Sequence, residues 1–317
     1  MALLRERREV EGLLDMNGAI EATEAAFREQ GEGKVLSHAP VRLILENRSM
    51  RVVQGALLGS RLIGYRLGRA SGFKKGTTIA VLCDSESGDL LAVMSYTLGS
   101  VRTGATFGVA TKYLTRQDAE NVAIIGTGRS AMDLLRGVMC VRPVKRIKVY
   151  SRDPSHRESF AEKAGATLGV TVAPWSSPAE VIKGSDILLV ATNSKGPVFN
   201  PASIEDGLLI ASMGRPCEID PDVYWRADLT VLADEKQELN LDLTGGFTNP
   251  LQGLKEDKGF WEGVRELGDV VCGRAGRRSD GEVTVFRDSQ GGWGDLALAQ
   301  KVLAKAKEAG LGKEVLF

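Results

Sequence analysis

A glycine-rich turn between an apolar segment and a helix is the part of this sequence best suited to holding a phosphate group. Residues 122–125 are apolar and precede Gly126-Thr127-Gly128-Arg129-Ser130-Ala131, a Gly-x-Gly-x-x-Ala pattern. Gly126 permits a tight turn, Gly128 lets the backbone approach a pyrophosphate, and Ala131 lets the helix pack closely on the strand. The helix start adds free N–H groups and a partial positive charge. The pattern predicts a dinucleotide-binding site.

The segments after the turn supply the context that this pattern needs. Residues 146–150 are a second apolar-rich segment, and residues 157–163 are typical of a helix. With the turn they make a strand-helix-strand unit, in which the pattern is a dinucleotide fingerprint rather than an ordinary tight turn. The cofactor contacts that we expect in this domain, besides those at the end of the second strand, are Gly126, Thr127, Gly128, Arg129, Ser130, Thr192 and Met213.

The residues at the end of the second strand bear on the choice between NAD(H) and NADP(H). An acid there would bind the ribose hydroxyls and repel a 2′-phosphate, whereas Ser151 and Arg152 offer a hydroxyl and a cation. This favours NADP(H) over NAD(H). In the alternative, Arg152 is a solvated loop residue and Asp153 turns inward to hold the ribose.

Composition narrows the class of protein. The chain has 317 residues, enough for about two domains, and its 43% hydrophobic and 26% charged residues are ordinary for a soluble globular protein. Lys plus Arg equals Asp plus Glu at 41 each, so neither nucleic acid nor a membrane is an expected partner. The four cysteines and two histidines are scattered, which gives no support to a metal site or a disulfide framework.

The N-terminal segment bears on where the protein works. Residues 1–10 are too charged for a secretory signal, and no apolar run approaches the roughly 18 residues of a membrane span. We therefore expect a cytoplasmic protein.

The chain changes character along its length. Residues 1–30 are predicted to be helical, residues 41–98 contain short β-like segments with a hairpin-type turn at 84–89, and residues 100–114 form a long helix. After the fingerprint, strand candidates at 186–191, 207–213 and 229–233 alternate with helices, as in a doubly wound parallel sheet.

A strongly periodic helix over residues 296–309 follows a Gly-rich hinge at 291–294. We expect this helix to return to the N-terminal domain. The predicted fold is therefore α/β, with a discontinuous α+β domain of residues 1–115 plus 293–317 and a Rossmann dinucleotide-binding domain of residues 116–292.

Four features in order along the chain resemble the ornithine cyclodeaminase/μ-crystallin family, which also contains amino-acid dehydrogenases and cyclic-ketimine reductases. They are Pro40-Val41-Arg42, the Val-Arg-Thr-Gly-Ala segment at 101–105 that runs into 110–114, the turn at Gly126, and residues 272–286 before the last helix. The resemblance spans nearly the whole chain. It implies a homodimer formed by the sheets of the N-terminal, substrate-binding and dimerisation domains, and a substrate cleft between each such domain and its own Rossmann domain.

The resemblance also implies that Arg42 and Arg102 hold the α-carboxylate of the substrate. The chemistry agrees, because a planar guanidinium binds a carboxylate through two parallel charge-assisted hydrogen bonds. Two arginines can therefore fix both the position and the tilt of an amino or imino acid.

Two departures from the family concern acid/base chemistry. The family lysine near the reacting nitrogen is replaced by Arg66, and an arginine seldom releases its proton. The loop at 212–218, where cyclodeaminases carry an aspartate, has none. Lys75, or its neighbour Lys74, and Glu218 are the replacement candidates, although a solvated turn explains the lysines and a cap on the helix near Pro221 explains Glu218.

These features predict an NADP(H)-dependent reductase of a small α-imino acid or cyclic ketimine, or a dehydrogenase of the matching amino acid. The alternatives are a cyclodeaminase that recycles its cofactor and a cofactor-binding protein with little turnover. Arg66 suits a second anionic group and hints at an acidic substrate, unless it is a solvated strand residue. Tyr65 and Trp293 are expected to line the substrate pocket, although aromatic residues are more often part of the core.

Overall fold

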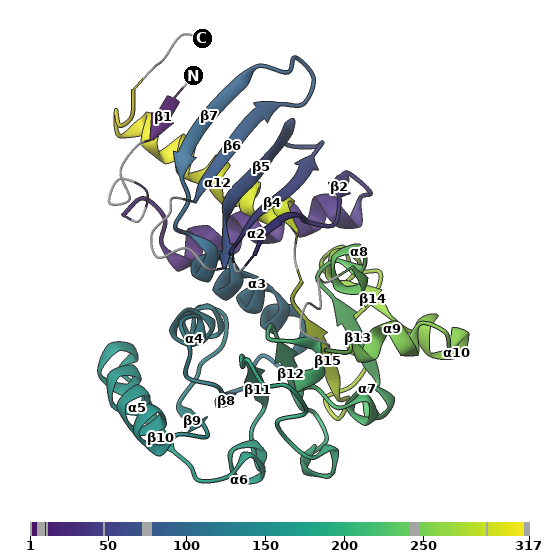
Figure 1. The fold of residues 1–317 in the computed structure, drawn as a ribbon. Coiled ribbons are helices and arrows are strands. Elements are labelled where there is room, and N and C mark those ends of the chain that lie inside the picture. Colours follow the sequence, from purple (N-terminus) through teal and green to yellow (C-terminus); the bar gives the residue numbers. More distant parts are fainter. Residues whose placement is uncertain are drawn as a thin grey trace. The chain divides into compact units, whose positions relative to one another are not determined.

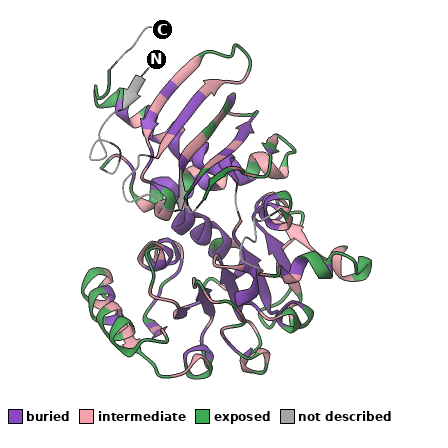
Figure 2. Ribbon diagram, in the orientation of Figure 1, coloured by how far each residue is buried: buried purple, intermediate pink, exposed green. Residues whose placement is uncertain are grey.

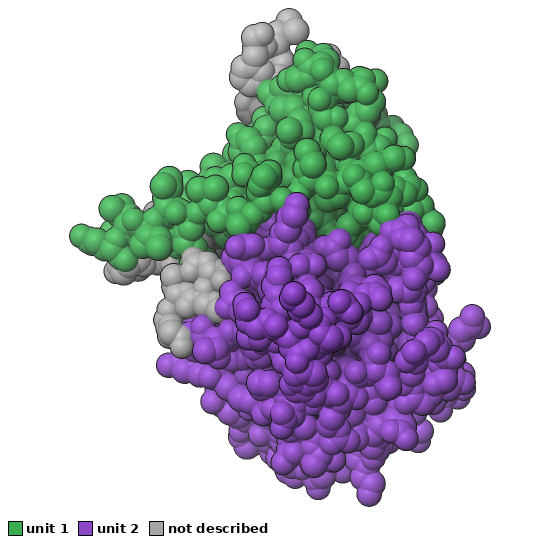
Figure 3. Space-filling view, turned by 90° about the vertical axis from the view of Figure 1, so that its right-hand side faces the viewer, with its two compact units in different colours: residues 1–102, 290–317 green, residues 103–289 purple. Residues whose placement is uncertain are grey.

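The computed structural model describes residues 2–4, 10, 12–46, 48–71, 78–240, 247–289 and 291–313. The chain divides into two compact units, unit 1 with residues 1–102 and 290–317, and unit 2 with residues 103–289 (Figure 3). The sequence places the boundaries after residues 115 and 292. The first observed division comes earlier, within helix α3 (Gly99–Leu114).

Unit 1 contains a sheet of seven strands in the order β1-β7-β6-β5-β4-β2, with β3 paired to β4 (Figure 1). Neighbouring strands are antiparallel, except that β1 runs parallel to β7. The helix predicted from residue 1 is therefore wrong at residues 2–4, because they add an edge strand to β7. The strands are β1 (Ala2–Leu4), β2 (Val35–Ser37), β3 (Val41–Leu45), β4 (Arg48–Leu57), β5 (Leu62–Ser71), β6 (Ile79–Asp84) and β7 (Leu90–Ser95).

Two helices complete unit 1. Helix α2 (Met16–Gly31) begins at Asp15, whose carboxylate accepts a hydrogen bond from the Gly18 N–H at 2.9 Å. Helix α12 (Gly292–Glu308) packs on strands β4, β5 and β6 and against α2. The predicted hinge at 291–294 is wrong, because residues 292–294 form the first turn of α12. A side chain at Gly292 would collide with the backbone of β4, its Cβ lying 2.7 Å from the Gln54 carbonyl carbon.

The other face of the unit 1 sheet, which we call the outer face, carries exposed apolar side chains. Strand register assigns the residues to this face, because directly paired residues point the same way. Ile63 is paired with Ala56, and Leu43 with Met50. The large apolar residues of the outer face that are classed as exposed are Leu36, Val41, Leu43, Leu45, Met50, Ile63 and Tyr65.

Unit 2 is a parallel sheet of eight strands in the order β10-β9-β8-β11-β12-β15-β13-β14. The order reverses between β8 and β11, and ligands of such sheets bind outside the carboxyl ends of the strands at this point. The predicted Rossmann fold is confirmed. The strands are β8 (Asn121–Ile125), β9 (Arg146–Tyr150), β10 (Thr171–Pro174), β11 (Ile187–Val190), β12 (Leu209–Ser212), β13 (Leu229–Leu232), β14 (Arg265–Glu266) and β15 (Thr284–Arg287).

The central strands of unit 2 are buried along their whole length (Figure 2). This is expected for parallel strands whose two faces are both covered by helices. Besides the later part of α3, the helices of unit 2 are α4 (Ala131–Met139), α5 (Pro154–Leu168), α6 (Pro178–Ile182), α7 (Pro221–Arg226), α8 (Glu235–Leu239), α9 (Pro250–Leu254), α10 (Lys258–Trp261) and α11 (Leu267–Val271), with short 3₁₀ turns at Pro201–Ser203 and Pro216–Glu218.

Helices α3 and α4 touch backbone to backbone at a pair of glycines. A Cβ added to Gly137 of α4 would lie 1.9 Å from the carbonyl oxygen of Gly104 in α3. Van der Waals contact between helix backbones therefore depends on the missing side chain. This close contact explains why residues of α3 from 103 onward belong to unit 2.

We predict that Gly137→Ala lowers the free energy of unfolding by about 1–3 kcal/mol, because the new methyl group overpacks the contact between α3 and α4. Gly165→Ala in α5 is the matched control, since its nearest atom would be 3.6 Å away. The control should instead raise stability by about 0.5–1 kcal/mol, as alanine does in a helix interior. Urea denaturation of both variants checks this. Equal effects of the two substitutions would contradict the packing argument.

Candidate functional site

The turn after β8 in unit 2 has the geometry of a phosphate-binding loop. The Gly126 N–H donates to the Tyr150 carbonyl at 2.9 Å, and Gly126 adopts a φ of 110°, a conformation that L side chains rarely adopt. A Cβ there would lie 2.3 Å from the Ala191 carbonyl oxygen. At Gly128 no atom lies within 4 Å of the added Cβ, which leaves the backbone open to a ligand. Gly126 therefore allows the predicted tight turn, and the space at Gly128 leaves room for the ligand that the sequence predicts there.

A cavity of about 910 Å³ lies over the carboxyl ends of β8, β9 and β11. Six of the predicted cofactor contacts line it, whereas Arg129, Ser130 and Met213 are not among its lining residues. Its size and position fit a dinucleotide at the switch point of the sheet. The predicted contacts that line it are Gly126, Thr127, Gly128, Ser151, Arg152 and Thr192.

The acidic residue nearest the end of β9 is used within the protein. The Asp153 carboxylate caps α5, accepting hydrogen bonds from the Ser155 N–H at 2.9 Å and the His156 N–H at 3.4 Å. It also accepts from the Ser155 hydroxyl at 2.7 Å. The bond from the Ser155 hydroxyl, followed by that from the His156 N–H, lowers the pKa of Asp153 below its usual value. The carboxylate therefore caps the start of α5, and Asp153 also lines the cavity.

Glu218 is a structural residue, which corrects its predicted catalytic role. Its side chain is fully buried, and Oε2 accepts from the Thr192 N–H at 2.9 Å and the Thr192 hydroxyl at 2.7 Å. Oε1 accepts from the Ser212 hydroxyl at 2.7 Å and the Gly214 N–H at 2.8 Å. A carboxylate with this many donors ties together the loops after β11 and β12. The alternative helix cap is also wrong, because Asp220 caps α7.

Arg287, at the end of β15, completes this buried network. Its guanidinium lies 3.9 Å from Glu218 Oε1 and 3.3 Å from Glu238 Oε1. Burial alone would lower the pKa of Arg287, but the Glu238 carboxylate raises it above its usual value. Both acids and the arginine are inaccessible to solvent, so this network supports the loops without taking part in acid/base chemistry.

Four arginines gather on the face of the unit 1 sheet that α12 covers, and we call Arg42, Arg51, Arg66 and Arg102 the arginine cluster. Arg42 of β3 lies directly opposite Arg51 of β4. Arg66 lies on the neighbouring β5, opposite Val53 of β4. Paired residues and residues two apart on a strand share one side of a sheet, so these three side chains do so. Arg102 comes from the first turns of α3.

Asp295, in the first turn of α12, is the carboxylate of the cluster. Its Oδ2 lies 2.6 Å from Arg66 Nε, and its Oδ1 lies 3.7 Å from Arg102 Nε. The Tyr96 hydroxyl donates to Oδ1 at 2.7 Å. Burial would raise the pKa of Asp295, but Arg66 and Arg102 lower it below its usual value. Asp295 is therefore ionised and partly neutralises the cluster.

Among the described residues, the four arginines of the cluster carry more positive charge than Asp295 balances by itself. Burial, followed by the positive charges of Arg66, Arg42 and Arg102, lowers the pKa of Arg51 to about 10. Such a concentration of guanidinium groups is suited to an anionic ligand, because a bound carboxylate removes the mutual repulsion.

The remaining predicted substrate residues lie elsewhere. Trp293 is fully buried and its ring packs edge to face on Phe27 at 5.1 Å, so it belongs to the core rather than to a pocket. Tyr65 points to the outer face of the sheet, whereas its neighbour Arg66 points to the face covered by α12. Tyr65 is therefore not part of the arginine cluster. Lys75 and its neighbour Lys74 lie outside the described residues.

Arg51 and Asp295 were not among the predicted site residues. Arg51 is signalled by strand register, because it lies directly opposite Arg42 in the pair of β3 and β4, and opposite residues meet on one face of the sheet. No comparable signal marks Asp295, since its partner Arg66 is 229 residues away in the chain.

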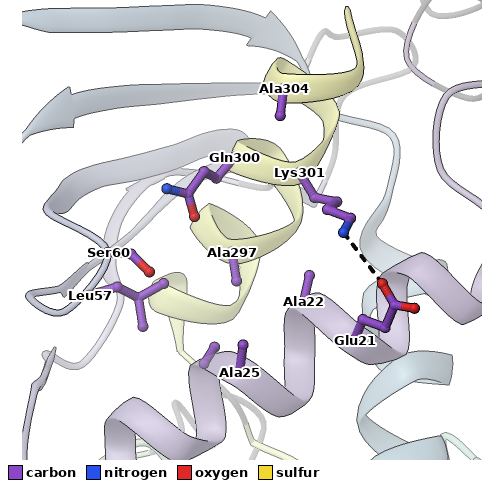
Figure 4. A pocket seen from close by; sticks show the side chains of 10 residues that line it. Glu21, Ala22, Ala25, Leu57, Ser60, Ala297, Gln300, Lys301 and Ala304 are labelled. Carbon is purple, nitrogen blue, oxygen red and sulfur yellow. Dashed lines mark hydrogen bonds and ion pairs between the residues drawn. The ribbon is translucent and has the colours of Figure 1, made fainter. Parts of the chain in front are cut away.

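A smaller hollow of about 340 Å³ lies between α2 and α12 (Figure 4). Half of its ten lining residues are alanines, and two of its charged side chains, Lys301 and Glu21, pair with each other at 3.3 Å. Among the residues that the structure describes, no three His, Cys, Asp or Glu side chains are grouped to hold a metal, and no helix has the length and apolar character of a membrane span.

Proteins with similar sequences and structures cover nearly the whole of this chain. The Delta(1)-pyrroline-2-carboxylate reductase of Bacillus cereus is 28% identical to this chain, over 99% of this chain and 100% of its own length. The structure of Thermococcus litoralis Delta(1)-pyrroline-2-carboxylate reductase with NADH and L-proline is 30% identical, with a TM-score of 0.87 over 99% of this chain and 100% of that one. An archaeal alanine dehydrogenase dimer with bound NAD is 26% identical, with a TM-score of 0.86 over 100% and 99% of the two chains.

The family-level comparison covers almost the whole sequence. A sequence model of the ornithine cyclodeaminase/mu-crystallin family matches residues 1–310. The predicted resemblance is therefore confirmed, and the chain belongs to the ornithine cyclodeaminase/mu-crystallin family.

Proposed function

We propose that this protein is an NAD(P)H-dependent reductase of a small α-imino acid or cyclic ketimine, which can also oxidise the matching amino acid. The arginine cluster carries the proposal, because among the described residues it brings four guanidinium groups near one carboxylate, that of Asp295, in a chain that also has a dinucleotide pocket. The named relatives that reduce Delta(1)-pyrroline-2-carboxylate, a cyclic imino acid, support the same reaction class.

The α-carboxylate of the substrate binds Arg42 and Arg102 in this proposal. The Arg102 Nε lies 3.7 Å from Asp295 Oδ1, which is longer than a good hydrogen bond. Arg42 comes from the neighbouring strand pair on the same side of the sheet as Arg66. Two guanidinium groups on different elements fix the plane of a carboxylate and hold the adjacent C=N bond in one orientation.

The reduction needs little acid/base help from the chain. When bound, the nicotinamide supplies a hydride that adds to the carbon of a protonated C=N bond, which leaves an amine and the oxidised dinucleotide. Arg66 is no substitute for a catalytic lysine, because the charge of Asp295 raises its pKa above an already high value. A substrate that arrives as an iminium ion already carries its proton. The protein then contributes clamping, orientation and exclusion of water.

We infer NADP(H) as the preferred cofactor. Ser151 and Arg152 line the dinucleotide pocket at the end of β9, while Asp153 is engaged as the cap of α5. A hydroxyl and a cation at this place favour a 2′-phosphate, and an engaged carboxylate competes poorly for ribose hydroxyls. The solved relatives named above contain NADH or NAD, so the preference is a specific property proposed for this chain.

The direct test is NADPH oxidation by the purified protein with Delta(1)-pyrroline-2-carboxylate and with imines formed from α-keto acids and ammonia. We expect stoichiometric NADPH oxidation at a turnover on the order of 1 per second or faster. Ornithine with catalytic NADP⁺ should release almost no ammonia, because positioned acid/base groups are worth about 10²–10⁴ in rate. Ammonia release without net redox change would show a cyclodeaminase, and cofactor binding without either reaction would show a binding protein.

The cofactor preference predicts that Arg152→Ala weakens NADPH binding by about 1.5–3 kcal/mol, the value of a hydrogen bond to a charged group, and leaves NADH binding unchanged. Fluorescence titration of both cofactors measures this. Arg146→Ala, at the opposite end of β9, is the matched control and should change neither affinity. Tighter binding of NADH than of NADPH to the unaltered protein would refute the preference.

We further propose that the protein is a homodimer paired through the outer face of unit 1. Seven exposed apolar side chains on one sheet face are more than single scattered surface residues, and a contiguous apolar patch marks an interaction site. The archaeal alanine dehydrogenase relative is itself a dimer.

Light scattering should give twice the chain mass of 34.1 kDa. Leu43→Asp, which places a charge among the exposed apolar side chains of the outer face, should shift the mass towards that of one chain. Leu311→Asp is the control, because Leu311 is also exposed but lies outside the sheet. A dimer that is unaffected by Leu43→Asp would place the interface elsewhere.

A further inference from the structure

The positive charge of Arg51 lies at a position in the sheet where it destabilises the protein when no ligand is bound. It is half-buried in β4 and lies directly opposite Arg42. Like charges in directly opposite positions of an antiparallel pair destabilise the sheet. Arg66 and Arg102 add to the repulsion, so that the pKa of Arg51 falls to about 10. A residue kept at such a cost is expected to serve a ligand.

The carboxylate of the cluster is already committed to other partners. Its Oδ2 faces Arg66 at 2.6 Å, and its Oδ1 accepts from Tyr96 at 2.7 Å and faces Arg102 at 3.7 Å. Asp295 influences Arg51 less than burial and the three arginines do. Within the described part of the chain, no carboxylate forms an ion pair with Arg51.

The α-carboxylate of the substrate does not balance the cluster either. If it binds Arg42 and Arg102, Arg66 remains paired with Asp295, and Arg51 is the guanidinium left over. A guanidinium presents a planar set of donors that matches one further carboxylate. A neutral side chain on the substrate would leave this half-buried charge uncompensated.

We propose that Arg51 binds a second anionic group of the substrate, so that the substrate class is a short dicarboxylic α-imino acid. This inference rests on the proposed reductase function and assigns its specificity. The reaction is balanced as before: hydride from NAD(P)H adds to the imine carbon, the protonated nitrogen becomes the amine, and both carboxylates stay unchanged. Arg66, which the sequence suggests for the second anion, is instead held by Asp295.

The test compares substrates that differ in one terminal group. With NADPH and ammonium, the imine of oxaloacetate is compared with that of 2-oxobutanoate, and the imine of 2-oxoglutarate with that of 2-oxopentanoate. We expect kcat/KM to favour at least one dicarboxylic imine by about 30-fold or more over its neutral counterpart, since an unpaired buried charge costs about 2 kcal/mol or more. Equal values within both pairs would overturn the proposal.

Variants assign the preference to one residue. Arg51→Gln should lower kcat/KM for the preferred dicarboxylic imine by about 30-fold and change that for the neutral imine less than about threefold. Arg51→Lys should keep part of the preference, because it keeps the charge. Arg28→Gln on α2, an exposed arginine of the same unit, should change neither value. Equal losses on both substrates in Arg51→Gln would show a general structural role instead.

Two measurements separate this proposal from the proposed function. Because Arg51 is repelled by its neighbours, Arg51→Gln should melt at the same or a higher temperature, and a clear drop would contradict its assignment to a ligand. If no imine is reduced, the reductase function fails, and calorimetry then decides the role of Arg51. Succinate should bind more tightly than butyrate, and Arg51→Gln should remove the difference. Equal binding of succinate and butyrate would refute the assignment of Arg51 to a second anionic group.

Discussion

A single buried carboxylate, Asp295, organises the positive charge of unit 1. It lies at the start of α12, which packs against the sheet, and it pairs with Arg66 of β5. Without the Asp295 carboxylate, the guanidinium groups of the partly buried arginine cluster would repel one another. Helix α12 therefore carries the counter-ion of arginines that lie in the first third of the chain, Arg66 and Arg102. The C-terminal segment thus supplies both core packing and the counter-ion of the arginine cluster.

The buried carboxylate of unit 2, Glu218, is surrounded by enough hydrogen-bond donors to balance it. Glu218 has hydrogen-bond donors on both oxygens and an arginine within ion-pair distance, so it is fully satisfied. Its work is to hold the loops that follow β11 and β12, one of which lines the dinucleotide pocket through Thr192. Asp295, by contrast, is one carboxylate among four arginines in the described part of the chain. The first network supports the loops of a pocket, whereas the second is the one for which we propose an anionic ligand.

Much of the fold could be predicted because its signals are local. The central strands β8 and β11 of the Rossmann sheet are largely apolar segments, and the fingerprint turn depends on glycines two residues apart. The site was predicted in part, because the resemblance pointed to arginines at recognisable motifs. Arg51 and Asp295 were missed because their roles arise from strand register and from a helix that returns across the chain. Glu218 was wrongly predicted because a loop carboxylate has the same sequence signal whether it is solvated or buried.

The arginine cluster also bears on how quickly an anion arrives. The chain as a whole carries equal numbers of acidic and basic residues, so it has no net charge to attract ligands from afar. The excess of guanidinium groups over Asp295 therefore acts only within roughly one Debye length, about 8 Å at physiological salt. Within that range it raises the local concentration of anions and speeds their encounter, an advantage that is lost as ionic strength rises. In the proposed function, this short-range field would act on an anionic substrate although the chain carries no net charge.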